Sequence, residues 1–514
     1  MQNSTTVKNP GYTPAPRTRS SRLSLGTIAF FVAFLALGVV ATLYLRYALG
    51  FLAGLGILGA IWLSLAYLRR SGLEVWQVLV LIAMSGYLIL NYGFENLAFH
   101  LGGVPIIISY LLMFTALGLA AFLHPNLLRV ARQEPAVFFL LAMFTLALFH
   151  LVIDVPKYGI WAIRDASMFF DCAFIILGLL WSRQKGSLTP LLKWLMIILF
   201  LNALYSLTFP WMDQISAWSP TSGVFLQIPV IGYYRGNYVY LGLGALFYLF
   251  FSRDVFKWPR WFVLLFAVVQ LFGLAILQAR QMYVALVVII VLLIVIGEVK
   301  KSGKLLLILG APVAAVMLLT MSGIEIPGRI GPVRADFFVE HIRSISGAEG
   351  TPGASVQGRM EWYDEVFGRI RKNPWFGEGF GQPLITFEND LTGAVVRQPH
   401  NSSVTVLARL GIVGLLPWFA LHLYIVSRFV YAFRQRRRLH RRMADFILWL
   451  FMLYVVYMIS SIVEPAFEFP SAAVPFYFFL GISLGLIRWQ LPVLAKQSVS
   501  EPAGAPGLAA PAMF

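Results

Sequence analysis

Cysteine and charged residues are scarce in this sequence, and each scarcity excludes a class of protein. Cys172 is the only cysteine among the 514 residues, so no disulfide bond can form within the chain. Charged residues make up 12% of the chain, well below the share of roughly 25% that soluble domains carry. Hydrophobic residues make up 59%. This composition excludes an ordinary soluble enzyme and predicts a protein that is built from membrane spans.

Several motifs that would assign a chemistry are also absent. Histidine, cysteine and acidic residues do not recur at the spacing of a metal site, and neither a P-loop nor a dinucleotide-binding fingerprint occurs. A lipase-type Gly-x-Ser-x-Gly motif is missing as well. Asp171 is a single acid near the outer end of an apolar run, so the paired carboxylates of a proton-coupled transporter are lacking. We therefore expect neither a metal nor a cofactor.

Long apolar runs are what the sequence has in abundance. A membrane-spanning helix needs about 20 apolar residues, and about fourteen runs approach this length. We predict an all-α integral membrane protein with about fourteen transmembrane helices, within a range of about 12–14. The predicted spans are 24–45, 49–68, 74–94, 104–123, 136–153, 166–182, 190–209, 236–252, 260–277, 281–297, 304–321, 402–430, 446–463 and 472–489.

The placement of the basic residues predicts the orientation of these spans. The chain has 40 basic and 23 acidic residues, a formal net charge of +17. Basic connections mark the cytoplasmic side of a membrane, and in this chain they alternate with poorly charged ones. The short outer connections carry Arg46, Lys157, Arg164, Arg235 and Arg280. We predict that the protein lies in a bacterial inner membrane, with both termini on the cytoplasmic side.

The densest basic run is Arg434–Arg442, and we interpret it as an anchor that faces anionic lipids. Binding to nucleic acid would require stacking aromatic residues or a recognised module beside it. Neither accompanies the run, so we expect no nucleic-acid partner.

The prediction divides the chain into five parts. Residues 1–22 and 491–514 have the composition of disordered segments, and we expect them to be cytoplasmic tails. Residues 23–321 and 401–490 hold the spans, and residues 322–400 form one large outer loop. This loop is the only polar segment that is long enough to fold, so we expect the chemistry of the protein there.

The large loop contains a predicted helix and a glycine-rich turn. The helix covers 359–372, where Asn373-Pro374 ends it because proline disfavours helix in the residue before it. Its apolar stripe consists of Trp362, Val366, Phe367 and Ile370. Residues 322–353 are rich in Gly, Pro and Ser, and we expect them to be irregular. The glycines of Phe376–Gly381 suit either a close approach to a ligand, such as a sugar, or a plain tight turn.

His400 is the first candidate for chemistry, because it stands at the predicted outer surface directly before a span. An unperturbed histidine titrates near pH ~6.5 and exchanges protons at neutral pH. Its position alone fits a catalytic base, and it equally fits an interfacial histidine that is bonded to a loop carbonyl.

Four arginines on the outer side are candidates for binding an anion. Arg280 begins a span. Placing a charge there costs free energy, so a charged residue in this position usually has a functional role. Arg359 opens the predicted loop helix, where a basic residue is mildly unfavourable. Arg235 and Arg164 lie beside further spans. The planar guanidinium suits phosphate, but each of the four also fits an orientation anchor, a snorkelling side chain or a salt bridge.

The order of these motifs resembles the family of O-antigen ligases and O-antigen polymerases. Arg280 resembles an arginine that heads a span in this family, and Tyr234-Arg235-Gly236-Asn237 is similar to its Arg-x-x-Gly segment in degenerate form. The resemblance covers roughly residues 232–415. The remaining motifs are Arg359-x-x-Trp362, Asn373-Pro374-Trp375-Phe376-Gly377-Glu378-Gly379, His400-Asn401 and Leu407-x-x-Leu410-Gly411-x-x-Gly414, whose glycines suggest close helix packing.

The resemblance implies a metal-independent membrane glycosyltransferase with a GT-C-like helical fold and a periplasmic active site. The donor would be a glycan on undecaprenyl pyrophosphate, and the acceptor either lipid A–core or another lipid-linked glycan. His400 would be the catalytic base, and Arg280 and Arg359 would bind the pyrophosphate. The secondary candidates are Arg235, Arg164, Trp362, Glu378 and Asn401.

Three alternatives to this function remain open. A flippase for lipid-linked glycans or another polytopic transporter would explain the spans but not the patterned loop, and no repeated halves are visible. A protein O-oligosaccharyltransferase would use the same donor with a different acceptor. A non-catalytic scaffold for envelope assembly is the third alternative.

Overall fold

The computed structural model describes residues 72–491, apart from 102–103, 185, 225–226, 233, 235, 256–258, 324–325, 344–350, 386–387, 390–393, 396, 437–438 and 440. The described residues all belong to the larger of two units of the chain, residues 68–514. The predicted tails 1–22 and 491–514 lie outside the described residues apart from Leu491, and the predicted spans 24–45 and 49–68 lie wholly outside them.

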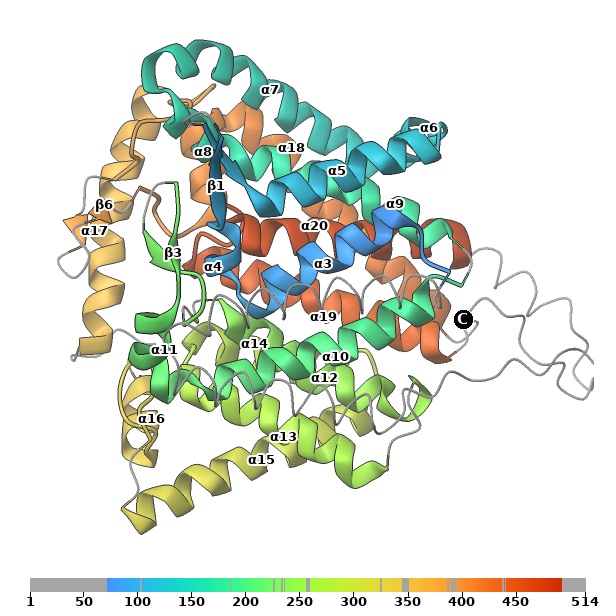
Figure 1. Cartoon of the computed structure of the whole chain (residues 1–514), viewed down its shortest axis with the longest axis vertical. Helices are drawn as coiled ribbons and strands as arrows, with labels where there is room; N and C mark the ends of the chain where they lie inside the picture. The colour runs from blue at the N-terminus through green and yellow to red at the C-terminus, as the bar shows by residue number, and fades with distance from the viewer. Residues whose placement is uncertain are drawn as a thin grey trace, which may run out of the picture. The chain divides into compact units, whose positions relative to one another are not determined.

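Helices dominate the described part of the chain (Figure 1). The N-terminal helices are α3 (Val75–Ile89), α4 (Tyr92–Glu95), α5 (Ile108–Leu123), α6 (Leu127–Arg132), α7 (Pro135–Tyr158), α8 (Ile160–Phe170), α9 (Ile175–Arg183), α10 (Leu188–Leu207) and α11 (Met212–Trp218). The remaining helices are α12 (Asn237–Val255), α13 (Arg260–Leu277), α14 (Arg280–Val295), α15 (Val299–Ser322), α16 (Ala335–Arg343), α17 (Thr351–Lys372), α18 (Ser402–Gln435), α19 (Arg441–Val463) and α20 (Pro470–Gly485). Short helical turns add η1 (Asp171–Phe174), η2 (Phe209–Trp211) and η5 (Leu486–Gln490).

In the described part of the chain, three small antiparallel pairs of strands interrupt the helices, which the all-α prediction did not foresee. They are β1 (Ala98–Leu101) with β2 (Val104–Ile107), β3 (Thr221–Ser222) with β4 (Ile228–Pro229), and β5 (Glu388–Asn389) with β6 (Ala394–Val395). Each pair contains only a few residues, so the fold remains helical in character.

Among the described residues, six helices are long and apolar enough to cross a membrane, which makes this a multi-pass membrane protein. They are Pro135–Tyr158, Leu188–Leu207, Val299–Ser322, Ser402–Gln435, Arg441–Val463 and Pro470–Gln490. The other predicted spans in the described region coincide with shorter apolar helices, or with the α8–η1–α9 segment that a 3₁₀ turn interrupts. The helical membrane fold is therefore confirmed, whereas the count of about fourteen spans stays a prediction.

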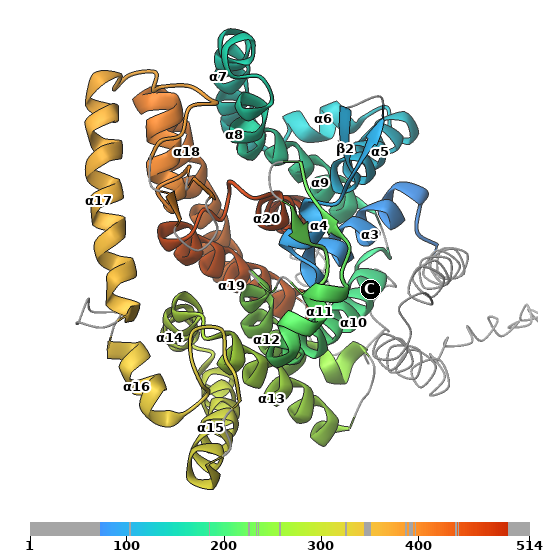
Figure 2. The same cartoon turned by 60° about the vertical axis from the view of Figure 1, so that its left-hand side comes forward.

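The large loop is more helical than the sequence indicated. The expectation of irregular structure over 322–353 is wrong for α16, and α17 begins at Thr351 rather than at Arg359. Helix α17 ends at Lys372, as the following Asn373-Pro374 predicted. It lies alongside α18 (Figure 2).

The apolar stripe of α17 is narrower than predicted. Val366 and Ile370 are buried in a cluster with Leu384, Ile385 and Ala408, and Trp362 packs against them. Phe367 is 39% exposed, so its place in the stripe was wrong.

The close crossing of α9 and α20 depends on two glycines. A Cβ atom on Gly178 would lie 2.0 Å from the carbonyl oxygen of Phe478. A Cβ atom on Gly481 would lie 2.1 Å from the carbonyl oxygen of Ile175. Small residues of this kind let helix backbones approach each other inside a membrane.

We predict that Gly481→Ala lowers the melting temperature of the detergent-purified protein. Overpacking of this kind costs about 1–3 kcal/mol, because the added methyl group meets backbone atoms that cannot rotate away. Gly118→Ala on α5 is the matched control, since its Cβ atom would meet no atom within 4 Å. Thermal unfolding measures both variants, and equal melting temperatures would contradict the close crossing.

Candidate functional site

Arg280 stands at the first position of α14, at a sharp turn that follows α13. Gln278 ends α13 with a left-handed φ of 48°, and Ala279 is the N-cap residue of α14. The start of a helix carries a partial positive charge, so a cation is unfavourable there and an anion is favourable. An anionic ligand would therefore relieve the charge at this position.

The side chain of Gln278 fastens the start of the large loop to this turn. Its Oε1 accepts hydrogen bonds from the backbone N–H groups of Ile330 (2.8 Å) and Gly331 (3.1 Å), and its Nε2 donates to the Gly331 carbonyl (2.9 Å). Arg329 Nε donates to the carbonyl of Leu277 at 2.9 Å. This clamp brings a second arginine, Arg329, near Arg280. The sequence analysis missed Arg329.

Helix α17 supplies a third arginine and an aromatic side chain. Arg359 lies close enough to Arg280 for its charge to act on it. The prediction that Arg359 opens a helix was wrong, since it lies inside α17. Trp362, one turn later, meets the ring of His400 edge to face, with centroids 5.3 Å apart and an interplanar angle of 74°. The structure thus brings Trp362 and His400 together.

Glu464 links His400 to the arginines. Its Oε2 lies 4.0 Å from His400 Nδ1, and its charge acts on Arg280 as well. The segment that carries Glu464 is tied to the start of α18, because Ser402 Oγ donates to Glu468 at 2.6 Å. The backbone N–H of Phe467 donates to the same Oγ atom. The sequence analysis did not consider Glu464, although Glu464-Pro465 directly follows an apolar run on the outer side.

Three arginines belong to this cluster, which we name the arginine–histidine cluster (Arg280, Arg329, Arg359, His400 and Glu464). Partial burial and the positive charges of Arg359 and Arg329 lower the pKa of Arg280, and the Glu464 carboxylate raises it. Arginine nevertheless stays protonated in proteins. The planar guanidinium groups carry several N–H donors, which suit a dianion such as a diphosphate diester.

A pocket adjoins the cluster at Glu464. Its walls come from α4, α12, α19 and the segment that leads into α20. The side chains that carry rings or hydrogen-bonding groups are Asn91, Tyr92, Tyr238, Tyr240, Tyr457, Ser460, Glu464, Phe469 and Ser471. Aromatic faces beside a few polar groups are suited to a small ligand that is partly apolar and partly polar.

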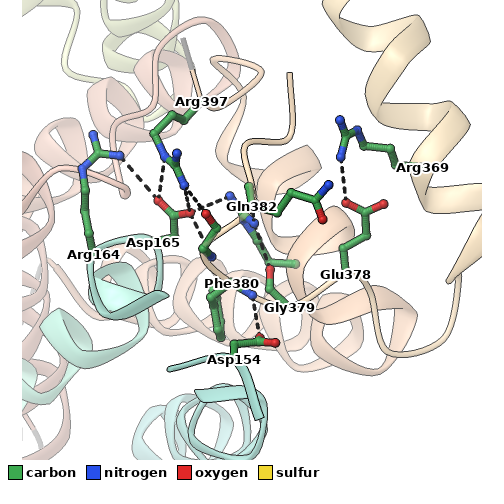
Figure 3. Close-up of polar contacts among 11 residues, drawn as sticks. Asp154, Arg164, Asp165, Arg369, Glu378, Gly379, Phe380, Gln382 and Arg397 are labelled. Carbon is green, nitrogen blue, oxygen red and sulfur yellow. Dashed lines mark hydrogen bonds and ion pairs between the residues drawn. The ribbon is translucent and has the colours of Figure 1, made fainter. Parts of the chain in front are cut away.

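A second group of charges surrounds Asp165 on α8 (Figure 3). The Oδ2 atom of Asp165 accepts from Arg397 Nη2 at 2.9 Å and from Arg409 Nη2 at 3.0 Å. Arg164 lies 3.4 Å from Oδ1. Burial raises the pKa of Asp165, but the charges of Arg409, Arg397 and Arg164 outweigh it, so the pKa is lowered overall. This group, the Asp165 network, holds the loop to the helices.

The glycine-rich turn packs closely against α7 and α18. Gly377, Gly379 and Gly381 all have positive φ, and added Cβ atoms would lie 2.2–2.5 Å from Arg409, Asp154 and Tyr158. Arg409 Nη1 donates to the carbonyl of Gly379 at 2.9 Å. The role of this turn in a sugar pocket stays a prediction. These glycines bring the backbone against α7 and α18.

Gly411 of α18, predicted with Gly414 to allow close helix packing, instead allows a kink in the helix. Gly411 has φ +64° and kinks α18, which frees the backbone N–H groups of the next two residues. Ile412 and Val413 donate instead to the carbonyls of Pro374 (2.9 Å) and Trp375 (3.1 Å). The kink thus docks the loop onto α18.

The secondary candidates lie in several places. Arg164 belongs to the Asp165 network and lies over the ring of Trp161. Glu378 pairs with Arg369 at 3.4 Å. Asn401 caps α18 by accepting from the N–H of Val404, and Arg235 lies outside the described residues.

Comparisons with known proteins confirm the resemblance for part of the chain. Residues 262–419 match the O-antigen ligase family. A 71-residue segment is 37% identical to an O-antigen ligase of Pseudomonas aeruginosa strain PAO1. This segment covers 14% of the chain and 16% of that relative. The family match includes Arg280, Arg329, Arg359 and His400, whereas Glu464 and Asp165 lie outside it.

We predict opposite effects of two substitutions on the binding of inorganic pyrophosphate. Arg280→Gln removes an attractive charge and weakens binding about fivefold, whereas Glu464→Gln removes a repulsive charge and strengthens it by a similar factor. Titration calorimetry at low salt measures both. Arg441→Gln, at the far end of the 23-residue helix α19, about 34 Å away, is the control and should bind like the wild type. Shifts in the same direction would contradict the geometry of the cluster.

Proposed function

We propose that this chain, whose residues 262–419 match the O-antigen ligase family, is a membrane glycosyltransferase. It transfers a glycan from undecaprenyl pyrophosphate to an acceptor hydroxyl at the periplasmic face of the inner membrane. The observation that carries the proposal is the arginine–histidine cluster, in which three arginines, a histidine and a glutamate from five separate segments meet.

The arginines are proposed to bind the diphosphate of the donor. Guanidinium groups make paired hydrogen bonds to phosphate oxygens, and Arg280 adds the favourable start of a helix. These groups also stabilise the negative charge that builds up on the diphosphate as the glycosidic bond breaks. The leaving group is then a stabilised anion, which is consistent with a reaction that is independent of metal.

His400 is proposed to take the proton from the acceptor hydroxyl, as the oxygen of that hydroxyl attacks the anomeric carbon. Glu464 lies against His400 Nδ1 and favours the protonated imidazole that the step creates. Trp362 covers another side of the imidazole ring. We assign Glu464 and Trp362 as positioning residues.

The pocket beside Glu464 is proposed to receive the reacting sugar. Its tyrosines offer ring faces against which a sugar can pack, and the hydroxyl groups of Tyr240 and Tyr457 are hydrogen-bonded to each other. The apolar helices on either side would keep the polyprenyl chain in the bilayer, so that the diphosphate stays at the surface. The basic end of α18 lies 34 helical residues away from His400, which supports a site on the side opposite the basic connections.

A transporter of lipid-linked glycans is the second candidate, and one observation favours it. The 3₁₀ turn Asp171–Phe174 interrupts an apolar segment next to the buried Asp171, and transporters often have interrupted helices. Glycan transfer by the purified protein in detergent micelles separates the two candidates, because a flippase has no activity without two compartments.

We predict that His400→Ala lowers kcat at least about 100-fold, the usual range for loss of a general base. Binding of the lipid-linked donor should change by less than about threefold, as for a substitution away from the binding groups. Single-turnover transfer and equilibrium donor binding measure the two quantities. His100→Ala is the control, since His100 is an exposed histidine outside the cluster. Transfer at the wild-type rate by His400→Ala would remove the proposed base.

The size of the product is expected to distinguish ligase from polymerase. Purified protein is incubated with lipid-linked glycan and, in separate reactions, with lipid A–core, a second lipid-linked glycan or a hydroxyl-bearing peptide. A ligase gives one product that is extended by a whole glycan block on lipid A–core, and a polymerase gives a ladder of lipid-linked products. We predict the single block on lipid A–core. A ladder, or modification of the peptide alone, would contradict this.

A further inference from the structure

The Asp165 network joins three segments that are far apart in the sequence. Asp165 comes from α8, Arg397 from the end of the large loop, and Arg409 from α18. The side chains of Asp165 and Arg409 are each 1% exposed, and that of Arg397 is 10% exposed. Figure 3 shows Arg164 and Arg397 approaching Asp165 from different sides.

The side chain of Arg397 makes hydrogen bonds to two acceptors. Its Nη2 atom donates both to Asp165 Oδ2 (2.9 Å) and to the carbonyl of Gly381 (2.6 Å). The guanidinium also lies over the ring of Trp161, at 4.3 Å from its centroid. The backbone carbonyl of Arg397 accepts from the N–H of Leu384 at 3.0 Å. Both the side chain and the backbone of Arg397 are therefore fixed.

His400 follows Arg397 by three residues and has an unusual backbone conformation. Its φ is 53°, in the left-handed region that residues other than glycine rarely adopt. Such a conformation persists only where the surroundings hold the chain on both sides. On the far side, Asn401 is held as the N-cap of α18. On the near side, the anchor is Arg397.

We propose that Arg397 and Asp165 are a positioning pair for the imidazole of His400. This proposal rests on the proposed function, in which His400 is the catalytic base. A pair that only stabilised the fold would be replaceable without a specific effect on one step. A positioning pair acts on the step that needs the imidazole in place, because a displacement of about 1 Å at a reacting group can reduce a rate 100-fold.

The test is Arg397→Gln in the full-length protein, purified in detergent with its lipid-linked donor. We expect kcat to fall by about 10–100-fold, while the KM for the donor changes by less than about threefold. Arg397→Lys keeps the charge but lacks the planar fork, so it should restore only part of kcat. Arg369→Gln is the matched control. Arg369 lies in the same loop and is 18% exposed, but its partners are Glu365 and Glu378, and it should keep kcat within about threefold.

A second readout does not depend on catalysis. Diethyl pyrocarbonate modifies accessible histidines, and peptide mass spectrometry resolves His400 from the other six histidines of the chain. We expect the modification rate of His400 in Arg397→Gln to change several-fold, and that of His100 to stay the same. A wild-type kcat together with a wild-type modification rate would overturn the proposal.

These readouts separate the proposal from the proposed function. If His400→Ala still transfers glycan, the catalytic role fails, whereas the modification rate still reports whether Arg397 positions His400. If Arg397→Gln is not recovered as folded protein, Arg397→Lys answers the same question. A wild-type kcat in the folded Lys variant would show that the two hydrogen bonds of Arg397 Nη2, to Asp165 and to Gly381, are not needed, and would overturn the proposal.

Discussion

One buried carboxylate, Asp165, fixes the outer loop to the helices, and the candidate site depends on this attachment. The loop delivers Arg329, Arg359 and His400, but Arg280 and Glu464 come from the helices around it. Losing one partner of a buried ion pair costs about 3–5 kcal/mol, because the other charge stays buried without compensation. Replacing one member of the Asp165 network would therefore weaken the attachment at the end of the loop. A looser attachment there would not keep His400 in one position.

The docking of the loop uses the backbone as much as the charges. The kink at Gly411 exposes N–H groups that pair with Pro374 and Trp375, and the glycine-rich turn returns hydrogen bonds to Ala408 and Arg409. Helix α18 thereby carries the attachment of the loop and, at its first turn, the cap that follows His400. The result is a rigid frame around a cluster whose like charges repel one another. Such preorganised positive charge is what the stabilisation of a departing diphosphate requires.

Local features of the fold could be predicted from the sequence, whereas its long-range contacts could not. The end of α17 followed from Asn373-Pro374, and apolar runs located the helices. Arg280 and His400 were selected by their positions at the outer ends of spans, and Arg359 by its place at the predicted start of the loop helix. The structure links Arg280 to His400 through Glu464 and places Arg359 near Arg280. Glu464 itself was overlooked, because an acid after an apolar run has no local feature that points to a histidine 64 residues away. The contacts of the glycines of 376–381 could not be predicted for the same reason, since only tertiary structure shows that they approach α7 and α18.

The central claim is that guanidinium groups from α14, α17 and the start of the large loop share one diphosphate with His400 nearby. A cryo-EM structure of the protein with an undecaprenyl diphosphate sugar bound measures this most directly. We expect the diphosphate within hydrogen-bonding distance of Arg280 and Arg359, and the anomeric carbon on the side of His400. A diphosphate bound at the opposite end of α18, or one that contacts none of these arginines, would contradict the account.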